Sequence, residues 1–133
     1  MISGECFCSA ITYEIDGSLT AGRSCHCSRC RKAFSGAASA YAELAPGSTL
    51  RWTGEQQPET YSSFAGWAIG FCGSCGSTLC GLWQGEVHGV TLGCVNGDPG
   101  VVIEQHLFVG SKAPWDEIGG DAPQFDEAPP APG

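Results

Sequence analysis

The sequence predicts a single all-β domain that carries one short helix. Glycine is abundant, with 20 glycines among 133 residues, and short apolar runs are separated by turn residues. Few runs have the length and period of a helix, so strands with short connections are favoured. A chain of this length is close to the usual size of one domain. We expect the domain to cover residues 1–126, and the acidic, proline-rich residues 127–133 to be a disordered tail.

The amino-terminal elements are a cysteine knuckle and a half-buried strand. Cys6-Phe7-Cys8 follows a glycine and opens as the knuckle. Ile11, Tyr13 and Ile15 then occupy alternate positions, which is the pattern of a strand with one buried face. The turn pair Asp16-Gly17 is expected to end this strand.

The central part of the chain contains the predicted helix and most of the strands. Ser28 is suited to cap a short helix that runs through Arg31 and Phe34, and Gly36 is suited to end it. A hairpin is expected around Ala65-Gly66. The remaining runs predict strands at residues 37–43, 49–52, 59–64, 67–71, 77–83, 87–95 and 101–109.

The charge of the chain limits its partners. The formal net charge is -8, and five of the 14 acidic residues lie within residues 116–133. A nucleic-acid surface needs a cationic face, so no nucleic-acid partner is expected. No run is long and apolar enough to suggest a membrane partner, and the first residues lack the pattern of a secretory signal. We therefore expect a cytoplasmic protein, whose oligomeric state the sequence leaves open.

Three cysteines in six residues mark the chemical centre of the chain. Cys25, Cys27 and Cys30 are accompanied by four of the six basic residues, and a positive field favours thiolate over thiol. Three thiolates suit a zinc ion that keeps a fourth position open, as catalytic zinc sites do. The alternative is a closed site completed by His26, Cys80, Cys94 or His106. A redox Cys-x-x-Cys is less favoured because no βαβ pattern surrounds it. The four basic residues are Arg23, Arg29, Arg31 and Lys32.

The remaining cysteines predict a second metal site. A Cys-x-Cys pair cannot fill a tetrahedral site alone, and the pair Cys72 and Cys75, flanked by glycines, can complete it with Cys6 and Cys8. Zinc binding to such a set contributes on the order of 10 kcal/mol to folding. Cys80 and Cys94 lie in apolar runs without a nearby thiol, and we interpret them as buried small hydrophobic residues.

A further candidate region follows the last predicted strand. Glu104 and His106 alternate along the strand, so their side chains should leave on one face. A lone histidine is more often a hydrogen-bonded core residue than a site residue. With Lys112 and Trp115 downstream, His106 could instead form one wall of a pocket.

Taken in order, these motifs resemble the glutathione-dependent formaldehyde-activating enzyme family, which is also named for centromere protein V. The resemblance runs from Gly4 to about Phe125 and implies an Mss4-like fold, in which antiparallel sheets form a β-tent around two zinc sites. The matching runs are Gly4-x-Cys6-x-Cys8, Cys25-His26-Cys27-x-x-Cys30-Arg31-Lys32, Phe71-Cys72-x-x-Cys75-Gly76-Ser77-x-Leu79 and His106-Leu107-Phe108-Val109-x-Ser111-Lys112-Ala113-Pro114-Trp115.

The resemblance implies a zinc-dependent carbon-sulfur lyase that reversibly joins glutathione, or a related thiol, and formaldehyde. It assigns a structural zinc to Cys6, Cys8, Cys72 and Cys75, and a catalytic or labile zinc to Cys25, Cys27 and Cys30. We expect His106 or water to exchange the proton, and Arg31, Lys32, Lys112 and Trp115 to contact glutathione. Two departures are Ser9, where a glycine is usual, and the run 66–70, which lacks the basic residues common there.

Two other functions stay open at this stage. One is a non-catalytic, zinc-stabilised binding module of the Mss4 chaperone type, which a closed fourth ligand at the second zinc would favour. The other is thiol storage or zinc handling, which ready loss of metal from the Cys25 cluster would favour.

Overall fold

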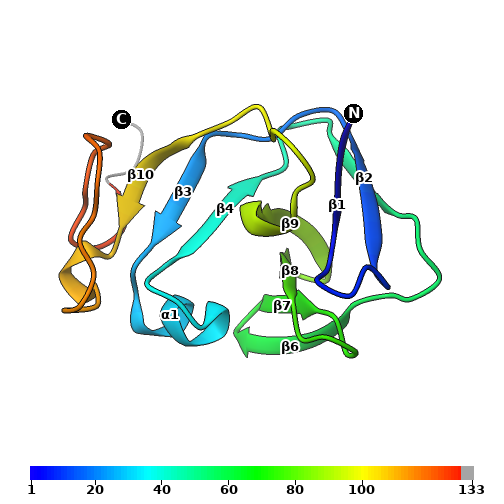
Figure 1. The fold of residues 1–133 in the computed structure, drawn as a ribbon, viewed down its shortest axis with the longest axis horizontal. Coiled ribbons are helices and arrows are strands. Elements are labelled where there is room, and N and C mark those ends of the chain that lie inside the picture. The colour runs from blue at the N-terminus through cyan, green and yellow to red at the C-terminus, as the bar shows by residue number, and fades with distance from the viewer. Residues whose placement is uncertain (130–133) are drawn as a thin grey trace.

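The computed structural model describes residues 1–129, and its strands form two sheets (Figure 1). The smaller sheet has the order β1-β2-β5, and the larger has the order β10-β3-β4-β9-β8-β7-β6. The strands of the smaller sheet are β1 (Ile2–Glu5), β2 (Thr12–Asp16) and β5 (Thr49–Trp52). Those of the larger are β3 (Gly22–Cys25), β4 (Ser39–Glu43), β6 (Glu59–Phe64), β7 (Trp67–Phe71), β8 (Thr78–Trp83), β9 (Glu86–Thr91) and β10 (Ile103–Leu107).

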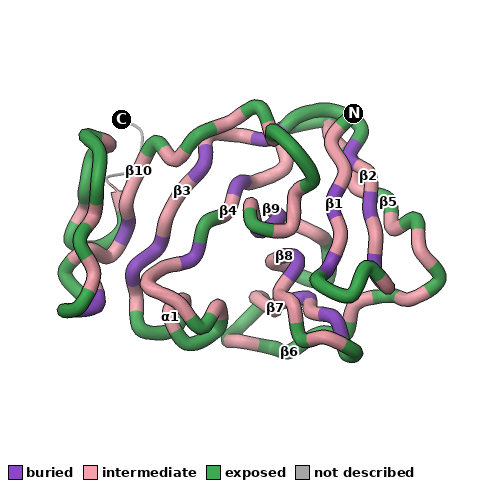
Figure 2. Tube along the Cα trace, in the orientation of Figure 1, coloured by how far each residue is buried: buried purple, intermediate pink, exposed green. Residues whose placement is uncertain are grey.

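The hydrophobic core joins the two sheets. Buried residues of β2 pack with buried residues of β4, β8 and β9, and buried positions recur along these strands (Figure 2). The alternation predicted for β2 is confirmed, because Ile11, Tyr13 and Ile15 are all buried while Thr12 and Glu14 are only partly so. The core cluster is Cys6, Ile11, Tyr13, Ile15, Leu19, Ala42, Cys72, Leu79 and Val90.

The single α-helix, α1 (Ser28–Phe34), differs from its prediction at both ends. The predicted cap Ser28 is wrong: Cys27 caps the helix, and its Sγ accepts a hydrogen bond from the Cys30 N–H at 3.3 Å. The helix ends at Phe34, and the capping residue Ser35 adopts the left-handed conformation expected of Gly36. A thiol that caps a helix is easily missed because the common caps are oxygen side chains.

Several strand boundaries also differ from the expectations. The predicted strand 87–95 ends at Thr91 and continues as a 3-10 turn, Leu92–Cys94, and the predicted strand 101–109 is shortened to β10 and a second turn, Val109–Ser111. Strands β1 and β3 were not predicted, because each has only four residues and little apolar alternation. One pair, β3 with β10, is parallel in an otherwise antiparallel larger sheet.

The carboxyl-terminal segment returns to the edge strand β10. The Phe125 N–H donates to the His106 carbonyl at 2.9 Å, and the Phe108 N–H donates to the Glu127 carbonyl at 3.0 Å. These bonds cover an edge that would otherwise present unpaired backbone groups. Of the expected tail 127–133, residues 130–133 lie outside the described part of the chain. Within residues 1–129, no helix has the length and apolar character needed to cross a bilayer.

A glycine in β1 makes the close contact between the first two strands possible. A Cβ built on Gly4 would lie 2.2 Å from the ring of Tyr13, which is fully buried and cannot move aside. We therefore expect Gly4→Ala to lower the free energy of unfolding by about 2–3 kcal/mol, as overpacking does. Urea unfolding would measure this loss. Gly81→Ala is the matched control, because a Cβ there meets nothing within 4 Å. Equal stability of the two variants would contradict the prediction.

Candidate metal centres

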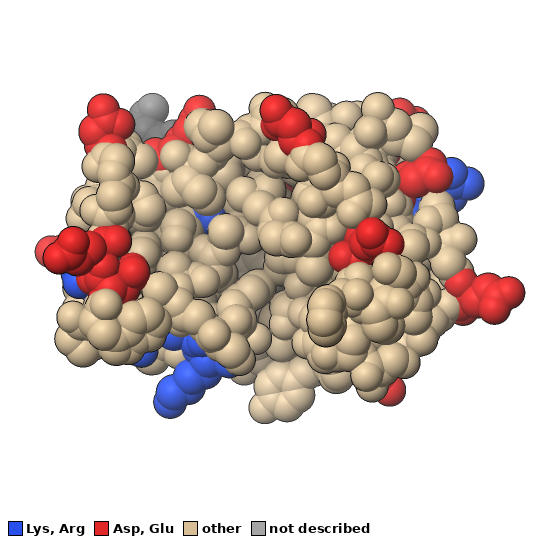
Figure 3. Space-filling view, in the orientation of Figure 1, with Lys and Arg blue, Asp and Glu red and all other residues tan. Residues whose placement is uncertain are grey.

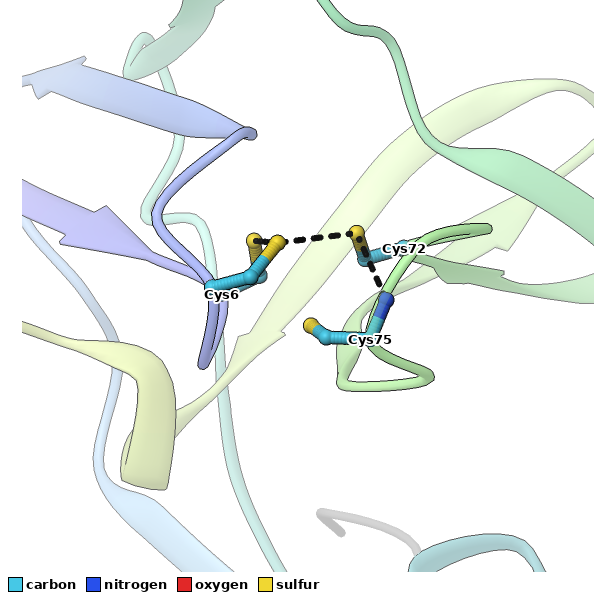
Figure 4. A group of neighbouring side chains, drawn as sticks. Cys6, Cys72 and Cys75 are labelled. Atoms are coloured by element: carbon cyan, nitrogen blue, oxygen red, sulfur yellow. Dashed lines mark hydrogen bonds between the residues drawn. The ribbon is translucent and has the colours of Figure 1, made fainter.

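Four cysteine thiols converge where the two sheets meet. The knuckle after β1 supplies Cys6 and Cys8, and the loop between β7 and β8 supplies Cys72 and Cys75 (Figure 4). The four sulfur atoms lie within 4.8 Å of one another, with 3.6 Å between Cys6 and Cys8 and 3.8 Å between Cys8 and Cys72. A tetrahedral zinc ion with Zn–S bonds of about 2.3 Å needs sulfur atoms about 3.8 Å apart. The set therefore fits zinc.

Two of these sulfur atoms accept hydrogen bonds from backbone N–H groups, which stabilise the thiolate form. The N–H of Ile11 donates to Cys6 Sγ at 3.3 Å, and the N–H of Cys75 donates to Cys72 Sγ at 3.4 Å. The Ser77 hydroxyl, 3.3 Å from Cys75 Sγ, lowers the pKa of the Cys75 thiol to about 5. Ser77 also accepts a bond from the Phe7 N–H at 2.9 Å, so one hydroxyl ties the two knuckles together. No short motif in the sequence indicates that Ser77 contacts both knuckles.

Three more thiols converge at the end of β3. Cys25 is the last residue of that strand, Cys27 caps α1, and Cys30 lies in the first turn of the helix. Their sulfur atoms lie within 4.8 Å of one another. The Cys25 thiol lowers the pKa of the Cys30 thiol to about 6, and the charge of Arg29 contributes. The hydrogen bond with Cys30 and burial raise the pKa of the Cys25 thiol, so in the metal-free chain the thiolate character is concentrated at Cys30. The spacing of the three sulfur atoms suits zinc, which displaces thiol protons when it binds.

The three-thiol cluster has no fourth cysteine, histidine or carboxylate ligand among residues 1–129. None of the four residues considered for a closed site, namely His26, Cys80, Cys94 and His106, joins it. The polar group nearest by register is Ser39, which pairs with Cys25 across β3 and β4 and is buried. Its hydroxyl helps to lower the pKa of the Cys30 thiol, so Ser39 lies beside the cluster, on the same face of the sheet as Cys25.

The helix that carries this cluster is held at few points. None of its residues is buried. Arg29 donates to the Ser63 carbonyl at 2.6 Å, and its guanidinium lies 4.4 Å from the centre of the Phe64 ring. At the other end, the Thr78 hydroxyl donates to the Ala33 carbonyl at 3.4 Å. Helix α1 is therefore fixed by its cysteines, by the β6–β7 hairpin and by β8.

His106 is placed against another histidine. His26 Nε2 and His106 Nδ1 are 3.0 Å apart, and the Ser24 hydroxyl lies 3.5 Å from the same nitrogen of His26. Successive strand residues point to opposite faces, so Cys25 points away from the side on which Ser24 meets the two histidines. His26 is buried, and burial lowers its pKa. The structure thus groups His106 with His26 and Ser24 rather than with the thiols.

Of the four residues expected to contact glutathione, one is bonded within the protein and the other three are partly or fully exposed to solvent. The Lys112 ammonium donates to the backbone carbonyls of Asp116 and Ala113, at 2.6 and 3.3 Å. Arg31 is half-buried and its Nε has no partner within the described protein, while Lys32 is exposed. Trp115 is 70% exposed. Two other cations are paired with acids, Arg23 with Glu43 and Arg51 with Glu14.

The two cysteines interpreted as hydrophobic residues differ from each other. Cys80 is buried, and burial raises the pKa of its thiol to about 11. Cys94 is only partly buried, and its thiol lies 3.6 Å from the Thr78 carbonyl. Neither belongs to a metal-ligand group of the described chain. All nine cysteines are free thiols, so no disulfide competes for the seven that are grouped.

Fold and site together define a β-sheet protein with two cysteine clusters of zinc-binding geometry, as in the Mss4-like fold. The model of the family described as glutathione-dependent formaldehyde-activating enzyme matches residues 1–111. The chain belongs to this family. A crystal structure of a Rhodobacter sphaeroides protein is similar, with 26% identity and a TM-score of 0.55, covering 92% of this chain and 99% of that chain. The search of curated proteins gave no match.

Proposed function

We propose that the protein is a zinc-dependent carbon-sulfur lyase that reversibly joins formaldehyde with glutathione or a related thiol. The observation that supports this most is the three-thiol cluster, which has no fourth ligand among the described residues. Such a cluster leaves one position of a tetrahedral ion for an incoming thiol. The family match supports the same class of reaction. A reducing cytoplasm suits a chain whose nine cysteines are all free.

Cys25, Cys27 and Cys30 would hold the catalytic zinc. When bound, zinc supplies a Lewis acid that lowers the pKa of a substrate thiol. The cations of α1 add to this effect: Arg29 is next to Cys30, and Arg31 and Lys32 lie in the last turn of the helix. Their positive field favours the thiolate form of any sulfur brought to this end of β3.

The reaction forms one carbon–sulfur bond, breaks the carbonyl π bond, and moves one proton from sulfur to oxygen through water. The substrate thiol loses its proton to water, its sulfur attacks the carbon of formaldehyde, and the carbonyl π electrons move to oxygen. The resulting alkoxide takes a proton from water and gives the S-hydroxymethyl product. In the lyase direction each step is reversed. We assign the proton transfer to water, because His106 is paired with His26 on the face of β3 opposite Cys25.

An NMR exchange experiment tests the proposed function. Formaldehyde is mixed with glutathione, or with 2-mercaptoethanol, and exchange between free and S-hydroxymethyl forms is measured with and without zinc-loaded protein. We expect protein to accelerate exchange in proportion to its concentration, and chelation of the labile zinc to remove the effect. If neither thiol exchanges faster than in buffer, the proposal is wrong and the non-catalytic binding module is favoured.

A further inference from the structure

One face of β3 and β4 carries the three-thiol cluster. Across these two strands, Cys25 pairs with Ser39 and Arg23 pairs with Tyr41. Alternate residues of a strand point to the same side of a sheet, and paired residues share a side, so these four side chains lie on one face. We call it the thiol face. Tyr41 is the diagonal neighbour of Cys25 on this face, and such neighbours are about 7–8 Å apart, within reach of an aromatic side chain.

Among the polar side chains that β3 and β4 place on the thiol face, Tyr41 has the hydroxyl that can serve a ligand. Ser39 is buried, and its hydroxyl acts on the Cys30 thiol. Arg23 forms an ion pair with Glu43 at 3.5 Å. Tyr41 is partly exposed, so its phenol is accessible from the open side of this face.

The Tyr41 phenol is a hydrogen-bond donor at neutral pH. A phenol has an ordinary pKa of about 10, so it carries its proton under these conditions. Burial raises the pKa of Tyr41 further, a negative charge on Cys25 adds to the rise, and the guanidinium of Arg23 opposes it. The effect of Cys25 agrees with the strand register, because both place the phenol beside the cluster.

The thiol face is open beside Tyr41. Glu43, the next residue of β4 on this face, pairs with Gly89, and Gly89 pairs with Gly81, so two glycines continue the face across β9 and β8. A Cβ built on Gly81 meets nothing within 4 Å. Figure 3 shows basic side chains beside α1, and the acidic side chains of this view lie away from the helix. A small aldehyde therefore has room here, in a field that favours an oxygen atom gaining negative charge.

We propose that Tyr41 is a catalytic residue of the lyase, whose O–H group donates a hydrogen bond to the aldehyde oxygen while the substrate sulfur attacks the aldehyde carbon. This inference rests on the proposed function. The carbon–sulfur bond forms, the carbonyl π electrons move to oxygen, and Tyr41 keeps its proton. Water then supplies the proton that completes the hydroxymethyl group. A donor placed where negative charge develops stabilises the transition state more than the free aldehyde.

Tyr41→Phe tests this role, because it removes one oxygen atom and keeps the ring. We expect the protein-dependent exchange rate to fall about a hundredfold, as loss of one donor to a developing oxyanion predicts. The KM for the thiol should not change, and the zinc content should stay at about two ions per chain. Tyr61→Phe is the matched control and should change none of these quantities. Tyr61 lies on the same face, through its pairing with Ile69 and that of Ile69 with Gly81, but on the edge strand β6, where it is 65% exposed.

A binding experiment tests the same hydrogen bond without catalysis. Cobalt(II) replaces zinc in the protein, and its absorption reports each thiol that binds the metal. Thioacetate has the sulfur–carbon–oxygen spacing of the S-hydroxymethyl adduct, whereas ethanethiol has no oxygen atom. We expect Tyr41→Phe to weaken thioacetate binding about tenfold, as loss of a hydrogen bond to a charged oxygen predicts, and to leave ethanethiol binding unchanged. Tyr61→Phe should affect neither ligand.

The two proposals fail in different ways. If the wild-type protein accelerates no exchange but thioacetate binding depends on Tyr41, the lyase proposal fails and Tyr41 remains a hydrogen-bond donor to a bound ligand. If exchange is accelerated and Tyr41→Phe retains the wild-type rate, the lyase proposal stands and the role of Tyr41 is overturned. The inference is also wrong if Tyr41→Phe weakens both ligands equally or loses zinc, since Tyr41 would then only support the cluster.

Discussion

Cys75→Ser is expected to prevent the chain from folding. Cys75 completes the four-thiol cluster, which joins the knuckle after β1 to the loop between β7 and β8. Two of its partners, Cys6 and Cys72, belong to the hydrophobic core. Zinc at such a site contributes on the order of 10 kcal/mol, which is comparable with the entire stability of a domain. Circular dichroism and a soluble-yield assay would detect the loss.

Cys94→Ser is the matched control for this prediction. Cys94 is a partly buried cysteine that belongs to neither cluster, so its loss should leave a folded protein with an unchanged metal content. A Cys75→Ser variant that is as stable as Cys94→Ser would show that the four-thiol cluster is not the structural centre. A variant that folds but binds half the metal would lead to the same conclusion.

Cys27→Ser is expected to remove the labile metal and the exchange activity while the fold persists. The three-thiol cluster lies at the end of β3 and on a helix without buried residues, so little of the core depends on it. Serine is itself a good helix cap, so the variant keeps the cap of α1 and loses only a thiolate. We expect the zinc content to fall from about two ions per chain to about one. Metal analysis, thermal unfolding and the NMR exchange assay would measure the three effects.

Cys27→Ala separates the two roles of this residue. It removes both the thiolate and the cap, so it should lose the same zinc as Cys27→Ser and also destabilise the helix by about 1 kcal/mol. Hydrogen exchange of the α1 amides would show the difference. If Cys27→Ser keeps two zinc ions, or if it unfolds as Cys75→Ser does, the assignment of roles to the two clusters is wrong.

The cysteine clusters could be predicted because their geometry is local in large part. Cys-x-x-Cys and Cys-x-Cys turns bring sulfur atoms together over a few bonds, and the structure brings the sulfur atoms of each predicted set within 4.8 Å of one another. The role of Cys27 as a helix cap could not be predicted from the common caps, which are oxygen side chains. Ser39 and Ser77 acquire their positions beside the thiols through strand pairing and loop contacts, which no short motif records.

His106 shows why a residue type and its strand position do not define a role. The alternation along residues 103–107 places its side chain on one face, but only the parallel pairing of β10 with β3 decides which neighbours it meets. Those neighbours are His26 and Ser24. The sequence likewise predicted that Lys112 contacts an anionic ligand, but its ammonium group donates hydrogen bonds to two backbone carbonyls of the protein itself.

The sequence by itself determined the β class of the domain, the division of seven thiols into sets of four and three, and the family, because alternation and short-range spacing act within a few residues. Only the tertiary structure decided the parallel edge strand, the partner of His106 and the engagement of the cations. These depend on contacts between residues distant in the chain, such as α1 with the β6–β7 hairpin and with β8, and such contacts form only when the sheets close around the core.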